Sequence, residues 1–149
     1  MLLREICSPE VACCSPDIHV LTAARLMRQK HVGDLVVVAD PDGDQTPMGI
    51  VTDRDIVLEV LGKELDPRKV AVRDIMRAPV VIADDSEDAW QALDRMRVHG
   101  VRRVPLMGAK HKLVGIVTLD DLVKGLAADA SALADIIERE QGNEHRRRR

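Results

Sequence analysis

The chain has 149 residues, the length of one ordinary domain or of two very small ones. Hydrophobic residues make up 46% and charged residues 32%, which is typical of a globular chain and excludes extensive disorder. One Trp with no Tyr or Phe excludes a nucleic-acid site built from stacked aromatic side chains. The net charge is −3, but residues 1–145 carry 18 basic and 25 acidic residues, a charge of −7 that disfavours non-specific binding to DNA or to anionic membranes.

The cysteine count and the apolar runs predict the compartment. An odd set of three cysteines (Cys7, Cys13 and Cys14) without a signal peptide indicates a reducing cytoplasm. No apolar run approaches the roughly 20 residues that a membrane span needs. The cysteines and histidines lack the paired spacing of a zinc site, so we expect no metal. Cys13 and Cys14 are interpreted as buried strand thiols, with a redox-sensing pair as the alternative.

The chain repeats itself with an offset of 69 residues, which falls to 66 after a shorter loop. Identical Gly-Ile-Val-Thr segments at 49–52 and 115–118 anchor the register, as do Met-Arg pairs at 27–28 and 96–97. An internal repeat of this kind determines the architecture more strongly than any single motif.

Taken in chain order, each repeat predicts the same elements. The first has a strand at 11–13, a helix, strands at 35–38 and 48–51, and a helix at 53–61 that stops at Gly62. The second has a strand at 80–82, a helix with Ala89, Ala92, Leu93 and Met96 on one face, strands at 104–107 and 113–117, and a helix at 119–127. A short helix at 72–76 is expected to enter the second repeat. A terminal helix at 130–140 follows, whose apolar stripe (Leu133, Ile136, Ile137) packs on the body or on a partner.

These elements predict an α/β (α+β) fold made of two pseudo-twofold-related β-α-β-β-α repeats, each a small three-stranded sheet with two helices. One such sheet is marginal alone, so two copies should cover each other's apolar faces. The expected divisions are repeat one at 6–62, a polar linker at 63–74, repeat two at 75–128, and a terminal helix with a basic tail at 129–149. The tail, His145 followed by four arginines, is interpreted as a frayed end, with a small nucleic-acid arm as the alternative.

Each third strand ends in Thr-x-x-Asp, first as Thr52 with Asp55 and again as Thr118 with Asp121. This spacing is that of a capping box, in which the Thr hydroxyl and the acid satisfy free N–H groups at a helix start. A strand that feeds directly into a helix N-terminus also suits a phosphate, and the carboxylate suits a ribose diol.

A second candidate feature is the segment Val101-Arg-Arg-Val-Pro105. Arg102 and Arg103 occupy the positions that Gly33 and Asp34 hold in the first repeat. Arginine forks onto phosphate whereas aspartate repels it, so two clefts between the repeats would be chemically unequal. The alternative is that both arginines are solvated charges at a strand end.

The β-α-β-β-α repeat, the Gly-Ile-Val-Thr-x-x-Asp ending and the Arg-Arg-Val-Pro strand resemble cystathionine-β-synthase-type (CBS) domains. The tandem pair resembles a Bateman module, and the likeness covers about residues 6–128. It is closest to the small stand-alone CBS-pair proteins of bacteria. The sequence departs from the pattern at Asp34, where a phosphate site prefers a base, and at Val36, where the second copy has Pro105.

The resemblance implies a non-catalytic regulatory module that binds an adenosyl nucleotide in clefts between the repeats. AMP, ADP or ATP is expected ahead of S-adenosylmethionine or NADH, and no cofactor is obligatory. Carried over by position, the ligand-binding residues are Thr52, Asp55, Thr118 and Asp121, flanked by Gly33, Asp34, Arg102, Arg103, Cys14 and Ala83. The family also associates as homodimers, for which Trp90 is a candidate anchor, with a part-buried core position as the alternative. The sequence names no downstream protein target.

Two other functions compete with nucleotide sensing. The chain could be a ligand-independent homodimeric scaffold whose capping boxes are only structural. An enzyme is the weaker alternative, because the repeats place no nucleophile–base set and no metal cluster. Asp53 and Asp55 lie two apart on a helix start and do not face one another.

Overall fold

Two equivalent halves make up the structure, a computed structural model that describes residues 1–148. The first half contains β1 (Cys13–Cys14), α2 (Val20–Lys30), β2 (Asp34–Val38), β3 (Pro47–Thr52) and α3 (Asp53–Ile56), which continues as a π-helical turn, Val57–Leu61. The second contains β4 (Ala83–Asp84), α5 (Ala89–His99), β5 (Arg103–Met107), a 3₁₀ turn (Ala109–His111), β6 (Leu113–Thr118) and α6 (Leu119–Arg147). Short helices, α1 (Leu3–Ile6) and α4 (Val72–Ile75), precede the two halves. The expected β-α-β-β-α unit is confirmed in both.

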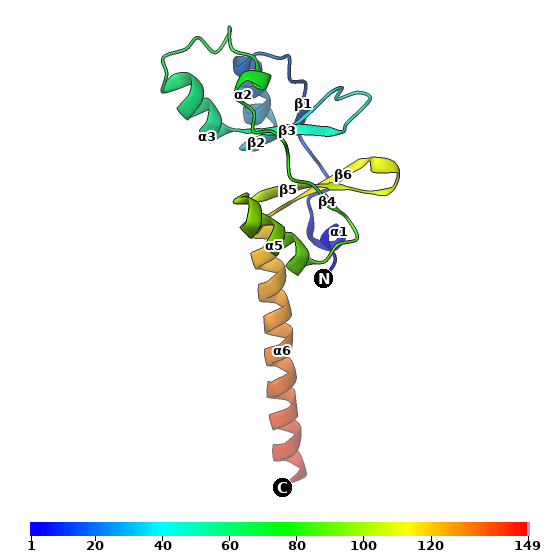
Figure 1. The fold of residues 1–149 in the computed structure, drawn as a ribbon. Coiled ribbons are helices and arrows are strands. Elements are labelled where there is room, and N and C mark those ends of the chain that lie inside the picture. Colours follow the sequence, from blue (N-terminus) through cyan, green and yellow to red (C-terminus); the bar gives the residue numbers. More distant parts are fainter. Residues whose placement is uncertain (149) are drawn as a thin grey trace.

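The two sheets have the same topology. Their orders are β1-β2-β3 and β4-β5-β6, with a parallel first pair and an antiparallel second pair. Both antiparallel pairs shift register at the same place, between Val37 and Val38 and between Leu106 and Met107. The sheets lie between the helices of the two halves (Figure 1), and the buried side chains between them come from both, namely Val36, Val38, Met107 and Leu113.

The short helices exchange between the halves. Leu3 of α1 is buried in the core of the second half, and Val72 of α4 in the core of the first. Residues beside these helices extend the sheets in the same crossed way, since Arg77 pairs with Ile50 of β3 and Ser8 pairs with Ile116 of β6. The helix predicted at 72–76 therefore forms, but it packs on the repeat that precedes it.

Three elements differ from the prediction by more than one residue at an end. The first strands lie at Cys13–Cys14 and Ala83–Asp84 rather than at 11–13 and 80–82, because only these residues pair with the adjacent parallel strand. The helices expected at 119–127 and 130–140 are one helix, α6. Only Ala128 and Asp129 separate the two predicted helices, and residues 119–147 contain no proline, so nothing in this stretch terminates the helix.

The distal half of α6 runs away from the body (Figure 1). Every residue from Ala127 to Arg148 except Gly142 is exposed, including Leu133, Ile136 and Ile137. The apolar stripe therefore does not pack on the body. The basic tail is helical through Arg147, and Arg149 lies outside the described residues.

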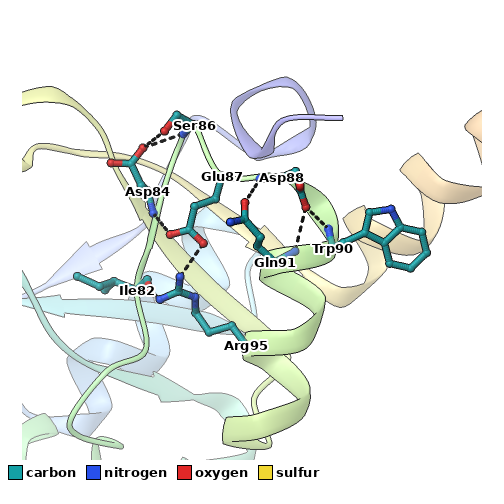
Figure 2. Close-up of polar contacts among 8 residues, drawn as sticks. All are labelled: Ile82, Asp84, Ser86, Glu87, Asp88, Trp90, Gln91 and Arg95. Atoms are coloured by element: carbon teal, nitrogen blue, oxygen red, sulfur yellow. Dashed lines mark hydrogen bonds and ion pairs between the residues drawn. The ribbon is translucent and has the colours of Figure 1, made fainter.

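Helix α5 begins at a polar network that leaves Trp90 outside the core (Figure 2). The Asp88 carboxylate accepts hydrogen bonds from the backbone N–H groups of Trp90 (2.8 Å) and Gln91 (3.0 Å). One turn further on, Arg95 donates to the carboxylate of Glu87 (2.6 Å) and to the carbonyl of Ile82 (2.9 Å). The Trp90 ring points away from these groups and is 65% exposed, so it is not a core residue.

Candidate functional site

Both Thr-x-x-Asp turns form the predicted capping boxes. The Thr52 hydroxyl accepts from the N–H of Asp55 (3.1 Å), and the Asp55 carboxylate accepts from the N–H of Thr52 (3.0 Å). The same exchange joins Thr118 and Asp121 at 3.2 and 2.9 Å, with the Thr118 hydroxyl also donating to the carboxylate at 2.8 Å. The turns are required to start α3 and α6 whatever else they do.

The two turns differ in the surroundings of their aspartates. The second oxygen of Asp55 pairs with the Arg77 guanidinium at 3.2 Å, and the Asp55 side chain is 6% exposed. Arg77 belongs to the segment that leads into the second half. Its backbone N–H donates to the carbonyl of Ile50 (2.9 Å), and its carbonyl accepts from the N–H of Ile50 (3.1 Å). Ser8 occupies the equivalent position of the first repeat, where it pairs with Ile116 of β6. Both Asp55 oxygens are therefore already hydrogen-bonded or ion-paired.

A cavity of about 460 Å³ opens beside the first turn, between the two halves. Three stretches of chain form its wall: the end of β3 with the start of α3, the segment before β4, and the approach to β5. The wall contains both aliphatic and charged residues. The lining residues are Ile50, Thr52, Asp53, Arg54, Arg77, Pro79, Val80, Val81, Gly100, Val101, Arg102 and Arg103.

The cavity gathers three of the ten residues predicted as ligand-binding, Thr52, Arg102 and Arg103. Asp55 lies behind the wall, held by Thr52 and Arg77. Cys14 and Ala83 are 2% and 3% exposed and belong to the cores of the two halves. The other four, Gly33, Asp34, Thr118 and Asp121, do not line this cavity.

The wall also contains residues that were not predicted from the sequence as site residues, namely Asp53, Arg54, Arg77 and the segment 79–81. Val80 and Val81 were predicted to lie in a strand, but they precede the paired residues of β4 and line the cavity, and Val81 also packs against the core of the second half. The only signal for Arg77 was its place in the internal repeat, opposite Ser8, and that signal cannot show which half the side chain contacts.

Asp34 and Arg103, equivalent positions in the two repeats, meet as an ion pair. The Nε of Arg103 lies 3.3 Å from a carboxylate oxygen of Asp34, a close approach without hydrogen-bond geometry. Burial raises the pKa of the Asp34 carboxyl, Arg103 opposes the rise, and the negative charge of Asp53 adds to it. The Asp34 carboxylate is therefore ion-paired with an arginine of the other half.

The cysteines are packing groups in this structure. Burial raises the pKa of the Cys14 thiol to about 12, with a further contribution from Cys13. Among residues 1–148, no three histidine, cysteine or acidic side chains come together in a group that could hold a metal ion. Within the same residues, none of the helices has the length and apolar character to cross a membrane.

Comparison with known proteins places these observations in a family. The CBS domain family matches residues 3–62 and 72–128. The chain is 34% identical to Hypoxic response protein 1 of Mycobacterium tuberculosis over 127 residues, 85% of this chain and 86% of that one. It is 33% identical to protein MK0525 of Methanopyrus kandleri over 120 residues, 80% of this chain, and spans 60% of that relative's length.

Solved structures agree with this assignment. Hypoxic Response Protein I, crystallised with two coordinated zinc ions, superposes with a TM-score of 0.71 at 32% identity, over 83% of this chain and 98% of that one. The CBS domain pair of protein MJ0100, in complex with 5′-methylthioadenosine and S-adenosyl-L-methionine, shares the fold at a TM-score of 0.73 and 24% identity, over 87% and 98% of the two chains. The chain therefore belongs to the CBS-domain family and carries two such domains in tandem.

Proposed function

We propose that this chain is a non-catalytic regulatory module that binds an adenosyl nucleotide of the AMP, ADP and ATP class between its two CBS domains. The observation that carries the proposal is the 460 Å³ cavity bounded by both halves. Its size falls within the range of small-molecule sites, and its wall combines aliphatic and charged surfaces as such sites do. A ligand that touches both halves can bias their relative arrangement, which is how a binding module reports occupancy.

The wall suits the parts of a nucleotide. Val80, Val81 and Val101 offer an aliphatic slot for a base, in a chain with one aromatic residue. The Thr52 hydroxyl and the Asp53 carboxylate are polar groups for a ribose. The guanidinium groups of Arg54, Arg77, Arg102 and Arg103 provide phosphate partners. A ribose contact from Asp55 is part of the proposal as well, and Asp55 would make it only by loosening its bond to Arg77.

The shared fold offers a precedent for this ligand class. The CBS pair of MJ0100 holds two adenosyl compounds, so the architecture accommodates this ligand class. The module would then be a sensor that acts through a separate effector protein.

Calorimetric unfolding tests the proposal with AMP, ADP, ATP, S-adenosylmethionine and NADH in turn. A ligand present at 100 times its Kd should raise the unfolding free energy by about 2.7 kcal/mol. Val80→Glu places a charge in the aliphatic slot and should abolish the shift. Ile82→Glu, two residues away and outside the wall, is the matched control and should retain it. If none of the five compounds raises the melting temperature, the proposal is wrong.

A second candidate function is a constitutive homodimeric scaffold. The exposed apolar side chains on α5 and α6 favour it, with Trp90, Leu133 and Ile136 each more than 60% exposed. Light scattering with and without nucleotide separates the two. A ligand-independent dimer with no thermal shift supports the scaffold, whereas a thermal shift supports the sensor in either oligomeric state.

A further inference from the structure

The residues of the cavity wall and the residues at the equivalent positions of the internal repeat carry different charges. The wall residues with charged side chains are Asp53 and four arginines (Arg54, Arg77, Arg102 and Arg103). The internal repeat places Leu119 opposite Asp53 and, opposite the four arginines, Asp120, Ser8, Gly33 and Asp34 in that order. Glu10 also stands where the wall has Pro79. The same architecture is thus basic on one side of the internal symmetry and acidic on the other.

Two of the four arginines are already paired. Arg77 lies 3.2 Å from Asp55, and Arg103 lies 3.3 Å from Asp34. These pairs neutralise acids that would otherwise repel an anion at the wall. Because Arg77 and Arg103 offset these two carboxylates, the carboxylates do not cancel the positive charge of the other arginines at the cavity.

The other two arginines remain available. The closest acid to Arg102 is Asp120 at 3.9 Å, and both of these side chains are about 70% exposed or more. Within residues 1–148, the Arg54 guanidinium forms no ion pair. The neighbouring Asp53 carboxylate accepts a hydrogen bond from the backbone N–H of Arg54 and not from its guanidinium. Arg54 belongs to the first turn of α3 and Arg102 to the approach to β5, so the two guanidiniums are contributed by different halves.

From this arrangement we infer that the cavity is the single nucleotide site of the chain and that it selects an adenosine carrying two or more phosphates. The inference rests on the proposed adenosyl function and specifies its ligand. A tail with several charges reaches both Arg54 and Arg102, whereas a monophosphate satisfies one. The sulfonium and ammonium groups of S-adenosylmethionine meet like charge at this wall. Asp120 and Glu10 disfavour phosphate at the equivalent positions of the other half.

Isothermal titration of the full chain with ATP, ADP, AMP, adenosine, S-adenosylmethionine and inorganic tripolyphosphate tests the inference. We expect one ATP per chain, ADP and ATP bound about 10- to 100-fold more tightly than AMP, and binding that weakens as salt rises. Arg54→Gln and Arg102→Gln should each weaken ATP by about 10- to 100-fold and leave adenosine unchanged. Arg97→Gln removes an arginine of α5 that is 77% exposed and paired with Asp94, and it should leave every ligand unchanged.

The choice of ligands distinguishes a failure of the inference from a failure of the proposed adenosyl function. Two ATP per chain, AMP as tight as ATP, or S-adenosylmethionine as tight as ATP would each overturn the inference while the adenosyl function stands. Tripolyphosphate bound as tightly as ATP, with no detectable adenosine, would overturn the adenosyl function and leave the anion selectivity. No binding by any compound would overturn both. Thermal unfolding of each variant without ligand confirms that the substitution leaves the fold intact.

Discussion

The N-terminus of α5 allows a stability prediction with a control built into the repeat. The Asp88 carboxylate caps this helix by accepting hydrogen bonds from two backbone N–H groups, at 2.8 and 3.0 Å, and the Asp88 N–H donates to the side-chain oxygen of Gln91 at 2.9 Å (Figure 2). His19 holds the same position before α2, and its side chain makes no capping hydrogen bond. Asp88→Ala therefore removes a cap, whereas His19→Ala removes none.

The magnitude follows from the bonds that are lost. Replacing a capping Asp by Ala costs about 1 kcal/mol, within a range of about 0.5–2 kcal/mol. For a domain of this size, 1 kcal/mol lowers the melting temperature by about 2–4 °C. His19→Ala should stay within about 0.5 kcal/mol of wild type, as substitutions of exposed residues generally do.

Urea unfolding followed by circular dichroism measures both changes, with calorimetry as a second probe. Asp88→Asn retains an acceptor oxygen and should remain near wild type. Equal losses for Asp88→Ala and His19→Ala would refute the reasoning, because the two positions would then differ in nothing that matters to stability. A loss for Asp88→Asn as large as that for Asp88→Ala would refute it too, since the capping oxygen would not be the cause.

Three further predictions concern other regions. At neutral pH a thiol reagent should leave Cys14 unmodified in the folded chain and modify it after unfolding, because burial raises its pKa to about 12; mass spectrometry of the labelled peptide checks this, and rapid labelling of the native chain would contradict it. Relative to Asp34→Asn, the free energy of unfolding of the wild type should fall as pH rises from below the unfolded pKa of 3.8 through the raised folded pKa of Asp34. The reason is that the folded state holds the Asp34 carboxyl proton more tightly than the unfolded state does. Urea unfolding across that pH range checks the sign, and a rise in the free energy of unfolding would contradict it. Truncation after Ala128 should change the melting temperature little, because the helix beyond it is exposed; a loss of several degrees, measured by calorimetry at one protein concentration, would show that these residues contact the body or a second copy.

Local patterns in the sequence predicted the elements well. The helical spacing around Ala92 and the two Thr-x-x-Asp turns each depend on residues within a few positions of one another. Hydrogen bonds of that range do not depend on how distant segments pack, so composition and spacing were enough to predict them. The first strands of the two repeats and the continuous α6 are exceptions, and in α6 the sequence contained no proline to justify the expected break.

The site depended on contacts between residues far apart in the chain. Arg77 reaches Asp55 across 22 positions, Asp34 meets Arg103 across the internal symmetry, and the two short helices exchange between the halves. The repeat showed which positions are equivalent but could not show which half each side chain contacts. That choice follows from burying the apolar faces of two marginal sheets against one another, which brings the lead-in of each repeat onto the other and thereby builds one basic cavity wall.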